Sequence, residues 1–547
     1  MAARHPDFER EQHRWEAEVL RQTGPTGSKV PARIRTILEL EPSEREPAQR
    51  EEVAAFFRPL SKTLGAISRQ LAASRAALAA ERAGQPNVLF LFSDDQRADT
   101  IGALGNADIR TPALDGLVQR GTAFTRTYCM GSQQGAVCVP SRAMLMSGRT
   151  LFRADEQLKG QTTWPEQFAQ AGYTTFMTGK WHNGGDSARR VFQRGKAVFL
   201  GGMGDPYKLP LQDLGAAHAF ENNRVSGEHS VQVFADAAVE FLQEQKGAAP
   251  FLCYVAFNGP HDPRIAPQEF RARFDGHEPP VPGNFLPVHP FNNGEMTVRD
   301  EALAPWPRTP ESVRQHLADY YASIEFMDAQ IARILAALKA GGQWEKTIVV
   351  FASDHGLALG SHGLFGKQNL YDHSMRAPLL LAGPGIPEGR RSEALCYLLD
   401  IFPTLGALAG VPAPEGSEGR SLAPVLAGKV GTPRAAILTA YTKVQRAVRD
   451  DRWKLIVYPQ INKTQLFDLA ADPLERRDLA GDPAQAGEVQ RMTALLRKEQ
   501  EIAGDNQPLS SATPQPAEFA FPPRKGQEKT PSGEPEVAPV AGTGARQ

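Results

Sequence analysis

The sequence predicts an α/β protein built on one large, mostly parallel β-sheet that is covered by helices on both faces. Continuous apolar runs, of the kind found in strands buried on both faces, recur along the chain, and amphipathic helical patterns lie between them. Strands that alternate with helices indicate a parallel sheet, because each helix returns the chain across one face. The apolar runs cover residues 87–92, 173–177, 251–257 and 347–351, and the clearest helical pattern covers residues 317–338.

Residues 1–85 differ in composition from this α/β part. They are rich in Ala, Arg, Glu and Leu, and apolar residues from Leu64 to Leu78 recur near helical spacing, so we expect two or three helices. Charged helical patterns of this kind form either a solvated extension or a helix pair that binds a partner. The sequence therefore predicts a helical N-terminal extension over 1–85 and an α/β domain over 86–428.

The pattern changes again after residue 428. Residues 447–458 have the pattern of a β-hairpin with a polar turn, and a further apolar segment follows at 465–469. We expect a small antiparallel subdomain over residues 429–504. Residues 505–547 are dominated by Pro, Gly, Glu and Ala and contain few large apolar side chains, which predicts a disordered tail.

Composition excludes several classes of function. The 547-residue chain has a formal net charge of -1, so it lacks the basic surplus of a nucleic-acid-binding protein. No apolar run approaches the roughly 20 residues of a membrane span, and the charged N-terminus lacks the apolar core of a signal peptide. Four cysteines are too few for a disulfide scaffold.

Polar side chains follow each of the four apolar runs. In an open parallel sheet, ligands bind outside the carboxyl ends of the strands, so we expect these segments to converge although they lie far apart in sequence. The four segments are Ser93-Asp94-Asp95, Gly179-Lys180-Trp181-His182, Asn258-Gly259-Pro260-His261 and Ser353-Asp354-His355-Gly356.

Asp94, Asp95 and Asp354 are candidate metal ligands among these side chains. Adjacent carboxylates repel each other unless a cation lies between them. Three carboxylates suit a hard divalent ion with oxygen ligands, either calcium or magnesium. Taken alone, the Asp94-Asp95 pair is better explained by a solvated turn or a helix cap.

One short motif resembles a known family. Cys138-Val139-Pro140-Ser141-Arg142 is similar to the C-x-P-S-R signature of the type I sulfatases, and the resemblance continues through AMLMSGR, GKWHNG and SDHGLALGSHG. It covers about residues 86 to 480. It implies an alkaline-phosphatase-like fold, in which Cys138 is oxidised by a maturation enzyme to formylglycine, whose hydrate is the nucleophile.

The resemblance also implies a set of metal ligands. It favours one calcium ion per chain, bound by Asp94, Asp95, Asp354 and the residue formed from Cys138. His355 occupies the position of the family's remaining side-chain ligand, which is often Asn or Gln. Imidazole is a less natural ligand for calcium than oxygen is, so His355 is either a ligand or a contact to the sulfate group.

The remaining candidates carry charge or move protons. Arg142, Lys180 and Lys367 supply fixed positive charge for a transferring sulfuryl group. His182 and His261 are candidates for proton transfer because histidine changes charge near neutral pH. By resemblance, His182 takes a proton from the formylglycine hydrate, and His261 assists the leaving alcohol with Lys367 nearby.

The sequence thus predicts a sulfatase that hydrolyses sulfate monoesters of a carbohydrate or a small alcohol. The alternative is a phosphonate monoester or phosphodiester hydrolase of the same superfamily, and a further one is a non-catalytic protein that holds sulfated glycans. The resemblance implies a periplasmic or extracellular location, which the N-terminal sequence leaves open. Substrate selectivity is expected to reside in the loops over 185–230 and 262–310. His362 and His373 either face substrate or are structural.

Overall fold

The computed structural model describes residues 6–21, 30–62, 84–215, 217–245 and 249–521. The chain forms two compact units, Met1–Gly84 and Gln85–Gln547, and each is described by itself. Every helix among the described residues is too short or too polar to cross a bilayer.

The first unit is helical where it is described. Helices α1 (Pro6–Arg21), α2 (Ala32–Leu38) and α3 (Pro47–Phe57) enclose a small apolar cluster around Ile37, Leu38 and Val53. A buried ion pair joins Arg45 to Glu16, with 2.7 Å between nitrogen and oxygen. The apolar residues from Leu64 to Leu78 lie outside the described residues.

The second unit contains the large sheet that the sequence predicts. Its described strands follow the order β11-β2-β10-β9-β1-β8-β4-β5-β6-β7, and β12 also pairs with β2. The central strands β9, β1, β8, β4 and β5 are mutually parallel, whereas β10, β6 and β7 run antiparallel to their neighbours. The prediction of a mostly parallel sheet is therefore confirmed. The strands are β1 (Asn87–Ser93), β2 (Gly121–Tyr128), β4 (Thr174–Lys180), β5 (Arg194–Phe199), β6 (Pro210–Leu214), β7 (Phe220–Val225), β8 (Phe251–Ala256), β9 (Thr347–Ser353), β10 (Arg376–Ala382), β11 (Arg390–Ser392) and β12 (Cys396–Tyr397).

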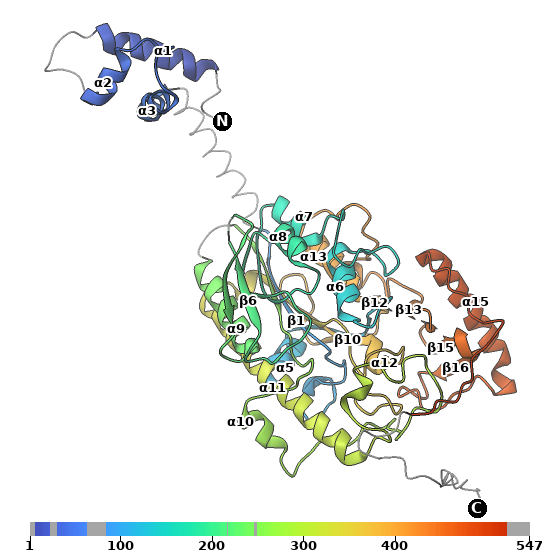
Figure 1. The fold of residues 1–547 in the computed structure, drawn as a ribbon. Helices are drawn as coiled ribbons and strands as arrows, with labels where there is room; N and C mark the ends of the chain where they lie inside the picture. The colour runs from blue at the N-terminus through green and yellow to red at the C-terminus, as the bar shows by residue number, and fades with distance from the viewer. Residues whose placement is uncertain (1–5, 22–29, 63–83, 216, 246–248, 522–547) are drawn as a thin grey trace, which may run out of the picture. The chain divides into compact units, whose positions relative to one another are not determined.

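Helices cover both faces of this sheet (Figure 1). Successive side chains of a strand point to opposite faces, so Phe90 and Phe92 pack with α6, α7 and α13, whereas Leu89 and Leu91 pack with α5, α9 and α11. Both apolar layers are thus covered, as a parallel sheet requires. The helices are α5 (Pro112–Gln119), α6 (Cys138–Ser147), α7 (Trp164–Gln170), α8 (Gly185–Val191), α9 (Ser230–Glu244), α10 (Gln268–Arg271), α11 (Pro310–Ala340), α12 (Asp372–Met375), α13 (Ile401–Ala409), α14 (Ala423–Leu426) and α15 (Ala486–Ala503).

A second, smaller sheet has the order β16-β15-β14-β13-β3. Its four C-terminal strands form an antiparallel meander, as predicted, and β3 adds in parallel to β13. Because β3 lies in the chain between β2 and α6, the small sheet is tied directly to the start of α6. The strands are β3 (Gly131–Ser132), β13 (Ile437–Tyr441), β14 (Gln445–Arg449), β15 (Trp453–Tyr458) and β16 (Lys463–Asp468).

Residues 505–521 differ from the disorder expected over 505–547. Asp505 forms a buried ion pair with Arg446 of β14, and Phe519 and Phe521 pack against the main apolar core. A few specific contacts hold this proline-containing segment in place, although its composition is poor in apolar residues. Residues 522–547 lie outside the described part of the chain.

Candidate active site

The four predicted strand ends meet at one edge of the large sheet. Strand β1 lies between β8 and β9, and β4 flanks β8, so the polar residues after each strand become neighbours. The amide of Asp94 donates to the carbonyl of Gly259 at 3.0 Å, and the amide of Asp95 donates to the carboxylate of Asp354 at 3.0 Å. Segments more than 150 residues apart along the chain are therefore joined by hydrogen bonds.

Two residues at this edge have an unusual backbone conformation. Asp95 and His182 both have left-handed φ angles, 64° and 70°. This conformation costs a residue other than glycine on the order of 1 kcal/mol. The surrounding structure holds both side chains in place at that cost.

Cys138 is the first residue of helix α6 and is buried. Its Sγ lies 3.2 Å from Nδ1 of His182 and 3.7 Å from Nζ of Lys180. Ser141, one turn further on, donates to the carbonyl of Asp354 at 2.8 Å and so anchors the helix against β9. Burial opposes ionisation of the thiol, but the charge of Lys180 and the hydrogen bond with His182 are the main causes that outweigh it, and the pKa of Cys138 lies well below its usual value.

Three carboxylates lie side by side behind Cys138. Asp94, Asp95 and Asp354 are all buried, and Oδ1 of Asp94 has no hydrogen-bond partner within the described chain. Burial opposes ionisation of Asp94, but Lys180 and Arg142 lower its pKa to about 2. Burial together with the charge of Asp94 raises the pKa of Asp354 instead, which is the expected response of crowded carboxylates.

His355 joins the same cluster. Its Nδ1 lies 3.0 Å from the carbonyl of Gly356, and its buried Nε2 has no partner among the described residues. Nε2 lies 3.7 Å from Oδ1 of Asp354, and the ligand atoms of Cys138, Asp354 and His355 lie within 4.8 Å of one another. Asp94, Asp95 and His261 form a second such group.

Three cations balance the three carboxylates. The guanidinium of Arg142 is 2.9 Å from Asp94 and 3.2 Å from Asp354, and Lys180 also pairs with Asp94. On the opposite side, Nζ of Lys367 is 2.9 Å from Asp95. A divalent ion added to this set would leave an excess of positive charge, which suits an anionic substrate.

His261 and Lys367 form a hydrogen-bonded pair. Nζ of Lys367 lies 3.0 Å from Nε2 of His261, and Nδ1 of His261 lies 2.8 Å from the carbonyl of Asp262. Burial lowers the pKa of His261 to about 4, whereas Asp95 keeps the pKa of Lys367 above its usual value despite burial. At neutral pH the proton of this pair therefore resides on Lys367.

A cavity of about 430 Å³ opens above these groups. Cys138, His182, His261 and Lys367 line it, whereas Arg142, Lys180 and the carboxylate cluster lie behind its wall. Both loops predicted to set selectivity contribute to the wall. The further residues that line the cavity are Gly135, Ala136, Gly202, Met203, Val298, Arg299, Asp300 and Gln368.

Gln368 was missed by sequence reasoning and connects several parts of this wall. Its side-chain nitrogen donates to Asp300 at 2.8 Å and to the carbonyl of Gly135 at 3.1 Å, and its side-chain oxygen accepts from the amide of Lys367 at 3.0 Å. Only its position next to Lys367 could have drawn attention to it.

His362 and His373 do not line this cavity. His362 stacks on Tyr371 with ring centroids 3.9 Å apart, and its Nε2 lies 2.9 Å from the carbonyl of Glu475. His373 is buried beside the same ring. Both histidines therefore pack with Tyr371 and are not part of the cavity wall.

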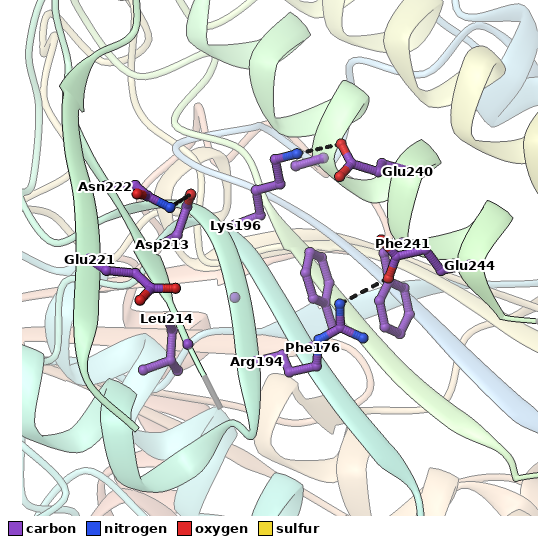
Figure 2. A pocket seen from close by; sticks show the side chains of 13 residues that line it. Phe176, Arg194, Lys196, Asp213, Leu214, Glu221, Asn222, Glu240, Phe241 and Glu244 are labelled. Carbon is purple, nitrogen blue, oxygen red and sulfur yellow. Dashed lines mark hydrogen bonds and ion pairs between the residues drawn. The ribbon is translucent and has the colours of Figure 1, made fainter. Parts of the chain in front are cut away.

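A separate cavity of about 320 Å³ lies at the opposite edge of the large sheet, between β5, β6, β7 and α9 (Figure 2). The charged side chains around it pair with each other, Lys196 with Glu240 and Arg194 with Glu244. None of the described residues that line it is a predicted site residue. It therefore has no part in the chemistry of the strand ends.

Comparison with known families gives two matches. The sulfatase family model matches residues 86–411, more than half of the chain, and the model for the C-terminal region of N-sulphoglucosamine sulphohydrolase matches residues 360–502.

Individual relatives are similar over most of their length. The chain is 26% identical over 517 residues to an N-acetylglucosamine-6-O-sulfatase of Bacteroides thetaiotaomicron, covering 79% of this chain and 89% of the relative. It is 29% identical over 436 residues to a choline-sulfatase of Rhizobium meliloti, covering 73% of this chain and 83% of the relative.

Solved structures are similar in fold. One, bound to its substrate D-glucosamine-2-N,6-O-disulfate, has a TM-score of 0.66 and 25% identity, over 78% of this chain and 99% of that protein. The phosphonate monoester hydrolase of Agrobacterium radiobacter has a TM-score of 0.63 and 22% identity, over 77% of this chain and 96% of that protein. This likeness is one of fold alone.

Proposed function

The chain belongs to the sulfatase family and is a sulfuric ester hydrolase, and we propose that it hydrolyses sulfate monoesters of carbohydrates or small alcohols through a formylglycine made from Cys138. The observation that carries the proposal is the position of Cys138. Its Sγ lies in the wall of the cavity, within reach of His182 and Lys180, and the His261–Lys367 pair lines the same cavity. We further propose that the catalytic domain spans 86–428 and the small subdomain 429–504.

Asp94, Asp95, Asp354 and His355 fit a calcium ion together with the residue formed from Cys138. The fit rests on the crowding of buried carboxylates, the unpartnered Oδ1 of Asp94 and the unpartnered Nε2 of His355. Bound calcium would neutralise these carboxylates and polarise an oxygen of the sulfate group.

Formylglycine would supply a hydroxyl nucleophile at position 138, once a maturation enzyme has oxidised the thiol and water has added to the resulting aldehyde. His182, whose Nδ1 is 3.2 Å from Sγ, is placed to hold or remove a proton there. Lys180 and Arg142, both buried behind the same position, stabilise negative charge as it develops there.

Lys367 and His261 act on the alcohol that leaves. Lys367 carries the proton of the pair at neutral pH, and its Nζ reaches the cavity beside Nε2 of His261. The reaction adds water across the sulfur–oxygen bond, so the alcohol oxygen must gain a proton as that bond breaks. The Lys367–His261 pair is in place to deliver it.

The size of the cavity bears on the substrate class. About 430 Å³ lies near the lower end of the range for small-molecule sites. A sulfate group with one sugar ring or a small alcohol suits this volume. Two of the relatives, which are named an N-acetylglucosamine-6-O-sulfatase and a choline-sulfatase, support the same range of substrates.

The test uses the full-length protein, produced with and without a formylglycine-generating enzyme. Mass spectrometry of the Cys138 peptide should show the aldehyde only in the active preparation. Cys138→Ala should abolish turnover of an aryl sulfate, whereas Cys253→Ala, which removes a buried thiol of β8, should retain it. Full activity with an intact thiol would refute the proposal.

Matched aryl sulfate, phosphate and phosphonate esters separate the alternatives. Sulfate should be turned over fastest, because sulfate is the best leaving group at the regeneration step. Faster phosphonate turnover would place the protein among the phosphonate hydrolases. Metal-free protein, checked by elemental analysis, should lose both activity and thermal stability, since Asp94, Asp95 and Asp354 then repel each other.

A further inference from the structure

Residues 505–521, which follow α15, are called here the C-terminal strap. The loop over residues 291–308, called the cavity loop, carries Val298, Arg299 and Asp300 into the cavity wall. The strap contacts the cavity loop near the start of the loop and again near the end of the loop. Neither the motifs nor the proposed chemistry accounts for these contacts.

The strap is first fixed to the small sheet. Asp505 is buried and accepts hydrogen bonds from Arg446 and, at 2.7 Å, from Gln500. Further on, Ser511 and Asn462 exchange two hydrogen bonds, of 2.7 and 2.9 Å. These anchors align the strap with the turn between β15 and β16.

The strap then contacts the cavity loop. The amide of Asn292 donates to the carbonyl of Ala517 at 2.7 Å, which ties down the start of the loop. The ring of Phe521 packs on Trp306 with centroids 5.4 Å apart, which ties down its end, and Phe519 packs on Phe521 at 4.9 Å. The three cavity residues lie in the chain between these two contacts.

The middle of the cavity loop has contacts of its own. Gly294 and Thr297 are exposed, but Met296 is buried in the main core and Arg299 forms an ion pair with Asp262. The strap adds a restraint near each end of the loop. A loop fixed at both ends has fewer conformations to lose when substrate binds, and this lowers the entropic cost of binding.

We propose that the C-terminal strap is a positioning element that holds the cavity loop in the conformation that binds the alcohol part of the substrate. The strap touches neither Cys138 nor the charged groups behind it, so it should govern substrate affinity and leave the sulfate-transfer step unchanged. This inference rests on the proposed function for the identity of the substrate, but the loop–strap contact is independent of it.

The experiment compares the full chain with Phe521→Ala and with a chain that ends at residue 504. Phe521→Tyr, which keeps the ring, and a chain that ends at residue 521 serve as matched controls. Three quantities are measured: KM and kcat for aryl sulfate and for a monosulfated sugar, inhibition by inorganic sulfate, and hydrogen exchange of peptides from 291–308.

Loss of one aromatic contact should raise KM for the sulfated sugar about three- to tenfold. The chain that ends at residue 504 should show a larger rise. We expect kcat and the inhibition constant of sulfate to stay within about twofold, and amides of the cavity loop to exchange faster. Both controls should behave as the full chain.

Unchanged KM and unchanged exchange would overturn the proposal. It would equally be overturned if kcat, sulfate inhibition and melting temperature changed together, because the strap would then be a general structural support. If the full chain hydrolysed none of the esters, the proposed function would fail, while hydrogen exchange would still decide whether the strap holds the loop.

Discussion

Replacing Glu301 by alanine should destabilise the protein and displace Lys367. Glu301 is buried, and its carboxylate accepts the amides of Phe365 and Gly366 at 2.7–3.0 Å, just ahead of Lys367. It also pairs with the buried guanidinium of Arg308 at 2.6 Å. The change therefore leaves two buried amides without their acceptor and one buried positive charge without its carboxylate partner.

The expected loss follows from these contacts. Burial raises the pKa of Glu301 and lowers that of Arg308, so each charge is disfavoured by its surroundings even with its partner present. Such a pair adds little net stability, but removing one partner costs about 3–5 kcal/mol. A unit of this size shifts its melting temperature by about 1 °C per kcal/mol, so we expect a decrease of about 4 °C.

Calorimetry of a double-mutant cycle tests this account. Glu301→Gln and Arg308→Met should each destabilise the protein, and the double variant should lose about 2 kcal/mol less than the sum of the two, because no unpaired charge remains. Glu240→Gln, which removes an exposed pair with Lys196, is the control and should cost less than about 1 kcal/mol.

Activity gives a second readout of the same change. Glu301→Ala frees the backbone before Lys367, and small displacements of a catalytic group are costly, so kcat should fall by about tenfold or more. Additive losses in the cycle, or an unchanged kcat in Glu301→Ala, would refute the reasoning.

Three further predictions concern the cavity and pH. Gly202→Ala places a Cβ 2.5 Å from Nε2 of His182, so the ring must move, and kcat should fall about tenfold or more while the melting temperature stays nearly constant. Asp300→Asn removes a negative charge from the cavity wall, so kcat/KM for a disulfated sugar should rise about tenfold relative to kcat/KM for a monosulfated sugar. An unchanged ratio would show that the charge of Asp300 does not select against a second sulfate group. Burial lowers the pKa of His229 from 6.5 to about 4. Because this folded-state pKa is depressed, its stabilising contribution is complete above pH 6.5 and is lost as pH falls towards 4, by up to about 3 kcal/mol. His229→Asn, whose side chain can still accept the amide of Val231, should show a flatter stability curve between pH 6.5 and 4, measured by thermal unfolding.

Residue pattern alone was enough to predict the large sheet and the edge at which the polar segments gather. Apolar runs such as 87–92 must be covered on both faces, and the carboxyl ends of parallel strands share one edge. Asp94 and Asp354 could therefore be expected to meet, and their hydrogen-bonded segments do so. These are local properties of the chain combined with a general rule of topology.

The antiparallel additions to the sheet were not predictable in this way. β10 and β2 resemble other buried strands in sequence, and only their pairing gives their direction. In the same way, β3 contains two residues and joins the small sheet because β13 lies beside it. Strands this short carry no periodic signal.

The wall of the cavity and the strap that holds it were decided by tertiary structure alone. Gly202, Asp300 and Gln368 come from separate loops, and no spacing in the sequence relates them. Residues 505–521 were expected to be disordered because composition measures average apolar content. Their order depends instead on a few single contacts, such as Phe521 on Trp306, with partners hundreds of residues away. Contacts of this kind exist only after the rest of the chain has folded, so the sequence could not show them in advance.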